Sequence, residues 1–305
     1  MIIITGGTSG IGAEIVKSII ENGAIVIFTG RSEKKALRLI KEIIEEKANE
    51  EKTKIEKRLI FKKLDLSDLS SVEEFGNWFV NQSGFTKINQ LYLNAGSWNP
   101  TYEETEAGYE KNFGINYLAH FYLLDFLYPK LINTDKHRVI ITSSSLQQKI
   151  FVKDFDVIDL EAEMKKFGKA KSYGKSKLAK IMMVHALKLK AEERDIEGKY
   201  FSFNPGQTKT AVQEKLTPFY IFRILFAIGN KIYIKTPYQA AQTAFQLCYD
   251  NYENLKNGGY YGNSKIKGYN KLGRDVKSVK DLWNSTIELL EKQEKVFINH
   301  LKRFN

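Results

Sequence analysis

The sequence is poor in cysteine and histidine. The first shortage excludes disulfides within the chain, and the two together argue against a metal site. Its 305 residues include one cysteine, Cys248, so no disulfide can form within the chain, which fits a reducing compartment. The four histidines are scattered at His120, His137, His185 and His300. With a lone cysteine they offer no persuasive metal-binding spacing. No metal is therefore expected in the protein.

Long apolar runs are also missing. The longest, Phe219 to Ile228, is interrupted by Arg223 and is well short of the roughly 20 residues that a spanning helix needs. The first apolar stretch, Ile2-Ile3-Ile4, follows Met1 directly, without the basic region, apolar core and cleavage site of a signal peptide. Together with the single cysteine, these features predict a cytoplasmic protein.

The charge is one-sided, because lysine and arginine outnumber the acidic residues and give a formal net charge of +11. Much of the lysine alternates with glutamate, as between Glu45 and Lys57. That pattern is typical of a solvated helix face, so we expect no nucleic-acid partner. The excess charge would still favour phosphorylated cofactors or an anionic membrane surface.

The chain begins with a pattern of strand, glycine-rich turn and helix. The β-branched run Ile2-Ile3-Ile4 precedes Thr5-Gly6-Gly7-Thr8-Ser9-Gly10-Ile11-Gly12, and helical periodicity then continues to Asn22. This is the context of a dinucleotide fingerprint: Gly6 permits a sharp turn, Gly10 lets the backbone approach a pyrophosphate, and Gly12 allows close packing. The helix N-terminus would then offer free N–H groups to the phosphates. A glycine turn without a ligand is the alternative.

The end of the second predicted strand, Ala24 to Thr29, indicates which nucleotide binds. NAD-binding proteins place a carboxylate there for the ribose hydroxyls. Here the place is taken by Gly30, and Arg31 follows. A guanidinium suits the 2′-phosphate of NADP. The alternative is an ordinary exposed arginine.

Strands and helices alternate through the rest of the chain. Further strands are predicted at Arg58–Leu64, Ile88–Leu93, Arg138–Thr142, Tyr200–Asn204 and, as a short seventh strand, Gly258–Gly262. Predicted helices include Glu33–Lys47, Leu69–Asn81, Gly108–Leu131, Leu178–Lys190, Tyr238–Tyr249 and Val279–Leu301. This alternation implies right-handed crossovers. We predict one α/β domain over residues 1–305, a doubly wound Rossmann-type fold whose seven-stranded parallel sheet has helices on both faces. A dinucleotide-binding half would cover about 1–142, and a catalytic and substrate-binding half about 143–305.

Polar or small residues follow several of these strands. Asp65 lies at the ligand-binding edge of such a sheet, although it could instead cap the helix at Leu69–Asn81. Asn94-Ala95-Gly96 would let a nucleotide lie against the backbone, and Ser143-Ser144-Ser145 follow the fifth strand. Asn116 is a polar amide in an apolar helix and must find partners.

Tyr173 and Lys177 are four residues apart and share one face of a predicted helix. The ammonium favours the phenolate and is expected to lower the pKa of the tyrosine towards neutrality. Hydride transfer to a carbonyl needs one such acid and one fixed donor for the oxygen. A tyrosine tuned by lysine, together with a serine, meets that need without a metal. On its own, the pair could also be a half-buried tyrosine near a solvated lysine.

From Ile2 to Leu290 the chain resembles the classical short-chain dehydrogenase/reductase family. The motifs that carry the resemblance occur in the family's order: Thr5-Gly6-x-x-x-Gly10-x-Gly12, Asn94-Ala95-Gly96, Asn116, the serines 143–145 and Tyr173-x-x-x-Lys177. The segment Tyr173 to Lys180 is similar to Tyr-x-x-Ser-Lys-Leu-Ala-Asn of the retinol dehydrogenase-like branch. Asn204 to Thr210 is similar to that branch's His-Pro-Gly-x-x-x-Thr, with Asn204 in place of histidine. The N-terminal anchor of the branch's membrane members has no counterpart.

The resemblance implies a role for each matching residue. Tyr173 would be the proton donor or acceptor, Lys177 would lower its pKa and bind the nicotinamide ribose, and Ser144 would hold the substrate oxygen. Ser143 or Ser145 are the alternatives to Ser144. Asn116 would anchor a water that links Lys177 to solvent. The implied cofactor-binding residues are Gly6, Thr8, Ser9, Gly10, Ile11, Gly12, Arg31, Asp65, Leu66, Asn94, Ala95, Gly96, Tyr173, Lys177, Pro205, Gly206, Thr208 and Thr210.

The predicted function is an NADP(H)-dependent oxidoreductase that interconverts a carbonyl and an alcohol. The expected walls of the substrate site are Ser97, Trp98, 146–167 and 211–234, which are rich in apolar side chains. We therefore expect an apolar substrate such as a lipid aldehyde, a retinoid or a steroid-like ketone. The alternative is an NADP-binding regulatory or scaffold protein on the same fold. Residues 219–234 are expected to form a substrate lid or a peripheral membrane contact, and a homodimer through the helices of Asn116 and Tyr173 is left open.

Overall fold

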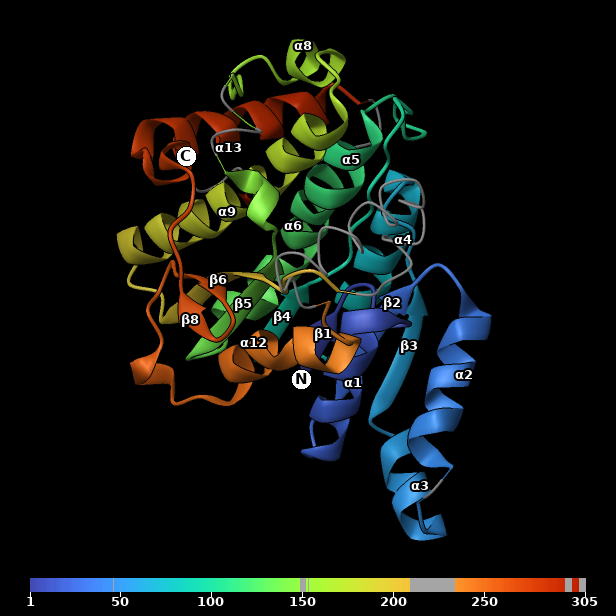
Figure 1. Ribbon diagram of the computed structural model, residues 1–305. Helices are drawn as coiled ribbons and strands as arrows, with labels where there is room; N and C mark the ends of the chain where they lie inside the picture. The colour runs from blue at the N-terminus through green and yellow to red at the C-terminus, as the bar shows by residue number, and fades with distance from the viewer. Residues whose placement is uncertain (46, 149–151, 153, 209–233, 294–297, 302–305) are drawn as a thin grey trace.

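One sheet runs through the protein (Figure 1). The computed structural model describes the chain except residues 46, 149–151, 153, 209–233, 294–297 and 302–305. The strands lie in the order β3-β2-β1-β4-β5-β6-β7-β8. Their bounds are β1 Ile2–Ile4, β2 Val26–Gly30, β3 Leu59–Lys63, β4 Gln90–Leu93, β5 His137–Thr142, β6 Gly198–Asn204, β7 Tyr260–Gly262 and β8 Lys265–Ile266. All neighbours from β3 to β7 pair in parallel, as predicted for a doubly wound α/β domain.

The seven predicted parallel strands are all present, and the sheet has one strand more than predicted. β8 pairs antiparallel with β7, with Tyr261 opposite Ile266. The two residues between these strands, Asn263 and Ser264, have φ of 51° and 56°. A two-residue hairpin turn of this kind requires positive φ at both positions, and asparagine tolerates it well. The chain therefore turns back on itself after β7 and adds an eighth strand at the sheet edge.

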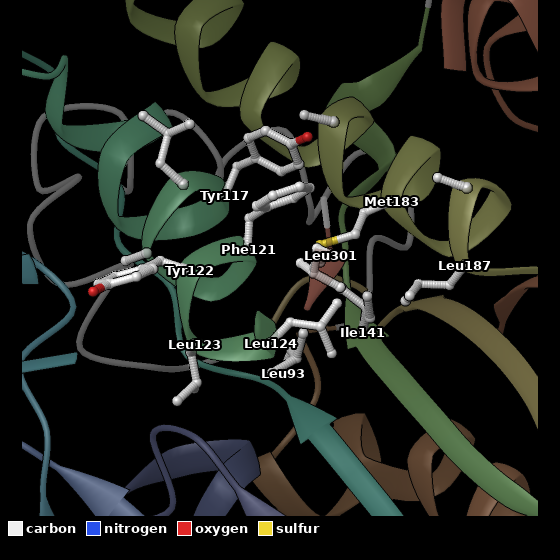
Figure 2. Packing of buried hydrophobic residues seen from close by; sticks show 14 of the residues in the cluster. Leu93, Tyr117, Phe121, Tyr122, Leu123, Leu124, Ile141, Met183, Leu187 and Leu301 are labelled. Carbon is white, nitrogen blue, oxygen red and sulfur yellow. The ribbon is translucent and has the colours of Figure 1, made fainter. Parts of the chain in front are cut away.

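Helices cover both faces of the sheet, and alternate residues of the strands point into two separate cores. Ile3 belongs to one hydrophobic cluster, while Ile2 and Ile4 belong to the other. The helices of the first face are α4 Leu69–Val80, α6 Ala119–Ile132, α9 Lys169–Glu193 and α13 Val276–Glu291. Those of the second are α1 Gly10–Glu21, α2 Glu33–Ile44, α3 Asn49–Glu56 and α12 Pro237–Tyr249. In Figure 2, Leu124 of α6 and Met183 of α9 lie in the first cluster with Ile141 of β5.

The helix predicted at Gly108–Leu131 is divided into three parts. It begins as α5 at Lys111–Phe113, continues as a π-helix, η1, at Gly114–Leu118, and then becomes α6. Glu110 fixes the start, because its carboxylate accepts the backbone N–H groups of Asn112 and Phe113 at 3.0 and 2.9 Å. Such π segments within helices are frequent at functional sites. Asn116 lies in the middle of this one.

The C-terminal part of the chain packs back on α6 and α9. α13 ends at Glu291, ten residues before the predicted Leu301, and its Trp283 meets Phe121 edge-on at a centroid distance of 4.8 Å. Buried Asp125 accepts the backbone N–H groups of residues 299, 300 and 301 at 2.7 to 2.9 Å. Part of the face proposed for a homodimer is thus covered by the chain itself.

The division near residue 142 stays a prediction. β5, which closes the first half, pairs with β6 of the second half over its whole length, so the sheet is continuous. The other short elements are α8 Leu160–Lys165, η2 Ser145–Gln147, η3 Tyr252–Asn254 and η4 Lys271–Arg274. None of the helices within the described ranges combines the length and apolar character that crossing a bilayer would need.

Candidate active site

A cleft of about 1200 Å³ opens along the carboxyl ends of the parallel strands. This is the edge at which open α/β sheets bind ligands. The predicted site residues that line it are Gly6, Thr8, Ser9, Gly10, Ile11, Gly12, Arg31, Asp65, Leu66, Asn94, Ala95, Gly96, Ser144, Tyr173, Lys177, Pro205, Gly206 and Thr208. The structure therefore brings together residues that are as much as 202 positions apart in the sequence, from Gly6 to Thr208.

The glycine-rich turn has the geometry that a pyrophosphate requires. Gly6 and Gly10 have φ of 67° and 57°, which side chains rarely adopt. A Cβ at Gly12 would lie 2.2 Å from the carbonyl oxygen of Gly6 and 2.7 Å from Asn94 Nδ2. Ser9 makes no side-chain hydrogen bond to the first turn of α1. The N–H groups of that turn therefore face the cleft and fit a bound phosphate.

Two cations stand at the end of β2. Exposed Arg31 lines the cleft, as does Lys35 in the first turn of α2. Among the described residues, neither forms an ion pair. Ser32 caps α2 by accepting the N–H of Lys35 at 3.3 Å. The sequence prediction missed Lys35, although its position one turn after this cap could have placed it beside Arg31.

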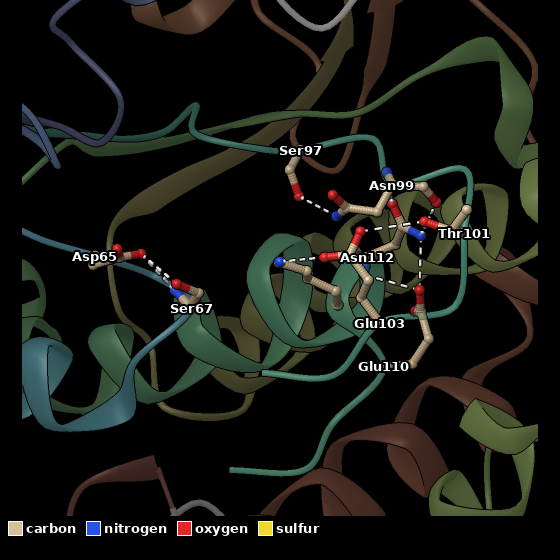
Figure 3. Close-up of polar contacts among 9 residues, drawn as sticks. Asp65, Ser67, Ser97, Asn99, Thr101, Glu103, Glu110 and Asn112 are labelled. Carbon is tan, nitrogen blue, oxygen red and sulfur yellow. Dashed lines mark hydrogen bonds and ion pairs between the residues drawn. The ribbon is translucent and has the colours of Figure 1, made fainter. Parts of the chain in front are cut away.

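Asp65 does not cap α4. Its carboxylate accepts the backbone N–H and the hydroxyl of Ser67 at 2.9 and 2.7 Å (Figure 3). The cap of α4 is Asp68, which accepts the N–H of Ser70 at 2.8 Å. Because Asp65 shapes the turn after β3 and lines the cleft, the helix-cap alternative for Asp65 is wrong.

The turn Asn94-Ala95-Gly96 forms the floor of the cleft and is fixed by side chains. Asn94 Nδ2 donates to the carbonyl of Thr5 at 3.1 Å, and Ala95 N donates to Thr5 Oγ1 at 3.0 Å. A Cβ at Gly96 would lie 3.0 Å from both Asn116 Oδ1 and Lys177 Nζ. Small residues are needed here because the polar groups behind the turn leave no room for larger ones.

Asn116 lies behind the cleft and finds the partners that its burial demands. Its Nδ2 donates to the carbonyl of Ser97 and to Ser176 Oγ, both at 3.0 Å, while its Oδ1 accepts Ser97 N at 2.8 Å. Ser97 belongs to a loop that is held by further polar contacts, because its Oγ accepts Asn99 Nδ2 at 3.0 Å (Figure 3). Asn116 thus ties the loop after β4 to α9, without lining the cleft itself.

Tyr173, Ser144 and Lys177 meet at the centre of the cleft. Tyr173 is half-buried, its ring lies edge-on to Trp98 at a centroid distance of 4.7 Å, and its hydroxyl lies next to that of Ser144. Lys177 is buried, and its Nζ lies 5.3 Å from the centroid of the Tyr173 ring and donates to the carbonyl of Thr142 at 3.4 Å. The hydroxyl of Ser143 instead donates to the backbone carbonyl of Lys177 at 2.9 Å. This engagement of Ser143 favours Ser144 as the serine that faces a substrate.

The prediction that the pKa of Tyr173 is lowered was wrong. Burial raises the pKa of the phenol to about 12, against a lowering contribution from the Ser144 hydrogen bond. Burial also lowers the pKa of Lys177 to about 8. The sequence showed the spacing of the two side chains but could not show how far both are removed from water. Desolvation therefore outweighs the lowering effect of the Ser144 hydroxyl on the pKa of Tyr173.

The far wall of the cleft is partly described. Gly206 has φ of 83°, and its N–H donates to Asn204 Oδ1 at 3.0 Å. Thr208 is buried and lines the cleft. Thr210 and residues 211–233 of the predicted substrate wall lie outside the described residues.

Several cleft residues were not predicted from the sequence. Ile115 comes from the π segment, and Lys169 and Ala170 come from the start of α9. Pro100 and Pro237 complete the rim. These positions have no motif of their own and enter the site only because the chain folds as it does.

Comparisons with known proteins point to one family. The family profile described as short chain dehydrogenase matches residues 1–153. Retinol dehydrogenase 14 of Mus musculus is 29% identical over 292 residues, which cover 93% of this chain and 83% of that protein. A short-chain dehydrogenase/reductase of Armillaria gallica is 34% identical over 224 residues, covering 72% of this chain and 68% of that protein. The solved structure of a Shigella flexneri short chain dehydrogenase complexed with NADP matches with a TM-score of 0.63 and 23% identity, covering 87% of this chain and 96% of that chain.

Proposed function

The chain belongs to the short-chain dehydrogenase family, and we propose that it is an NADP(H)-dependent oxidoreductase that interconverts a carbonyl and an alcohol on an apolar substrate. The observation that carries the proposal is the convergence of Ser144, Tyr173 and Lys177 in the cleft that the glycine-rich turn also lines. A regulatory or scaffold protein would need only the nucleotide half of this arrangement. The complete catalytic set favours the enzyme.

Tyr173, Ser144 and Lys177 each have a distinct task in the proposed reaction. The glycine-rich turn, Arg31 and Lys35 would hold NADPH, which would provide the hydride for the substrate carbon. Tyr173 donates its hydroxyl proton to the substrate oxygen, and a phenol with a raised pKa holds that proton at neutral pH. Ser144 offers a second hydrogen bond to the oxygen as negative charge develops on it. Protonated Lys177 stabilises the phenolate that forms when Tyr173 gives up its proton. Asn116 holds the Ser97 loop against α9, the helix that carries Tyr173 and Lys177.

The cleft fits NADP better than NAD. A carboxylate at the end of β2 would repel a 2′-phosphate, whereas Arg31 and Lys35 offer two positive charges there. The structural relative solved with NADP supports the same choice. The experiment that tests the whole proposal is NADPH consumption with a panel of apolar aldehydes and ketones.

Replacing Arg31 with alanine should shift the nucleotide preference. We expect the ratio of kcat/KM for NADPH to that for NADH to fall roughly 10- to 100-fold, because a charged hydrogen bond to the 2′-phosphate is lost. Steady-state rates with both nucleotides measure this ratio. Arg38→Ala, on α2 seven residues after Arg31 and not lining the cleft, is the matched control. A wild-type protein that prefers NADH would refute the role of Arg31.

Carbonyl reduction should decline as the pH rises above about 8, the pKa of buried Lys177. Below this pH the ammonium is charged and stabilises the phenolate, and above it the charge is lost. This decline is measured as kcat against pH with NADPH, and it forms the alkaline limb of the profile. Lys177→Arg should remove the limb, because a guanidinium stays charged throughout. A wild-type rate that stays constant to pH 10 would contradict this role of the lysine.

The substrate class rests on the part of the wall that is described. Trp98, Pro100, Ile115 and Leu146 are apolar residues that line the cleft, and the ring of Trp98 packs on that of Tyr173. They favour a lipid aldehyde, a retinoid or a steroid-like ketone over a sugar or a hydroxy acid. A substrate panel that returned small polar compounds as the best substrates would overturn this assignment. The cytoplasmic location, the homodimer and a peripheral membrane contact remain predictions.

A further inference from the structure

Lys180 is a buried lysine to which the proposed reaction assigns no task. It lies three residues after Lys177 on α9 and is 0% exposed. It also stands where the branch motif Tyr-x-x-Ser-Lys-Leu-Ala-Asn has asparagine. Its Nζ donates to the carbonyl oxygens of Leu93 and Ala95 at 3.1 and 3.2 Å. Both carbonyls belong to the end of β4 and the turn that forms the cleft floor.

The peptide between Ala95 and Gly96 is the point through which Lys180 acts on the site. Thr5 Oγ1 accepts the N–H of Ala95, and Lys180 holds the carbonyl of the same residue. The next Cα, that of Gly96, lies so close to Lys177 that a Cβ there would come within 3.0 Å of its Nζ. Any displacement of this peptide therefore changes both the cleft floor and the space around Lys177.

The surroundings of Lys180 disfavour a charged ammonium. The titratable groups that face it are Lys177 from its own helix and His120 from α6, whereas β4 presents backbone carbonyls. Within the described residues, no carboxylate pairs with it. Burial, and next the charge of Lys177, hold the pKa of Lys180 well below its usual value. An uncharged amine has two N–H groups, and two carbonyls accept from it.

We propose that Lys180 is a positioning residue that works as an uncharged amine. By donating to the carbonyls of Leu93 and Ala95, it fixes the turn Asn94-Ala95-Gly96 at the floor of the cofactor cleft. An asparagine amide also offers two N–H groups from one nitrogen, so the amine supplies the same pair of donors from a longer side chain. The identity of the cofactor rests on the proposed function, whereas the hydrogen bonds of Lys180 do not.

The first test compares NADPH affinity in three variants by fluorescence titration. Lys180→Met keeps the length but removes both donors, and its Kd should rise roughly ten-fold, because the carbonyls of Leu93 and Ala95 lose the donor that fixes them. Lys180→Gln restores two N–H groups without a charge and should recover most of the loss. Lys171→Gln, on an exposed position of the same helix, should bind as the wild type does. An unchanged Kd for Lys180→Met, or a Kd for Lys180→Gln as poor as that of Lys180→Met, would overturn the proposal.

The second test needs neither cofactor nor activity. A lysine whose pKa is depressed in the folded state takes up a proton on unfolding, at any pH between its folded and unfolded values. Its contribution to stability is present above the unfolded pKa and is lost as the pH falls through the folded pKa. The unfolding free energy, measured in urea, should therefore rise less steeply between pH 7 and pH 10 in Lys180→Gln than in the wild type, and the slope should fall by at most the amount that one proton contributes. Lys171→Gln should leave the slope unchanged.

The two tests separate this inference from the proposed function. A wild-type protein that fails to bind NADPH would defeat the proposed function, and Lys180 would still be judged by the pH dependence of unfolding. If Lys180→Met does not fold, Lys180→Gln and the unfolding series remain. An unfolding slope identical in Lys180→Gln and the wild type would show that Lys180 is charged in the folded protein, which contradicts the proposal.

Discussion

Replacing Tyr173 with phenylalanine should lower kcat roughly 10²- to 10⁴-fold, the usual contribution of a positioned acid or base. The substitution removes one hydroxyl and keeps the ring that packs on Trp98. Because the expected loss is that of proton transfer, the Kd for NADPH should stay within about three-fold of the wild type, well under the 1.4 kcal/mol that a ten-fold change represents. Stopped-flow reduction and fluorescence titration measure the two quantities separately.

The matched control is Tyr249→Phe. Tyr249 lies at the opposite end of α12 from the cleft residue Pro237, and its hydroxyl hydrogen-bonds with Ser18. It should leave turnover unchanged. A Tyr173→Phe protein that retained near wild-type rates would remove Tyr173 from the reaction, and the acid would have to be sought among other groups of the cleft.

Gly12→Ala should have the second large effect. The added Cβ would sit 2.2 Å from the backbone oxygen of Gly6, and a backbone atom cannot move aside as a flexible side chain can. The start of α1 must shift, so we expect a loss of about 1–3 kcal/mol in stability. Since the same N–H groups serve the phosphates, NADPH binding should weaken roughly 10- to 100-fold. Urea unfolding and NADPH titration measure both.

Gly84→Ala is the control for this substitution. Gly84 is exposed, and a Cβ there would meet nothing within 4 Å. This variant should match the wild type in both measurements. If Gly12→Ala also bound NADPH as the wild type does, the close approach of α1 to the turn would not be what shapes the nucleotide site.

The sequence was sufficient for most of the fold because strands β1 to β6 are short β-branched or aromatic runs, and a helix follows each of them. It could not reveal β8, a two-residue strand that exists only because Asn263 and Ser264 adopt positive φ. It also predicted one helix where the π segment around Asn116 interrupts it. Apolar periodicity continues through that segment, so the pattern carries no sign of the change in hydrogen bonding.

The site was predicted where a motif fixes both residue type and spacing, as for Gly6 and Gly12 or for Tyr173 and Lys177. It was missed where the function of a residue depends on a contact between distant elements. In the sequence, nothing distinguishes Lys180 from the other lysines of its helix. The structure does, because its Nζ donates to the carbonyl of Leu93 at the end of β4. The prediction that the pKa of Tyr173 is lowered failed for the same reason, because burial is a property of the packed protein and not of a four-residue spacing.

The most direct measurement of the central claim is the rate of NADPH and NADH consumption by the wild-type protein and Tyr173→Phe with apolar aldehydes and ketones. We predict turnover by the wild type with a preference for NADPH, and NADPH binding without turnover by Tyr173→Phe. Binding of NADPH without turnover of any carbonyl or alcohol by the wild type would contradict the account and point to a nucleotide-binding protein that is not an enzyme.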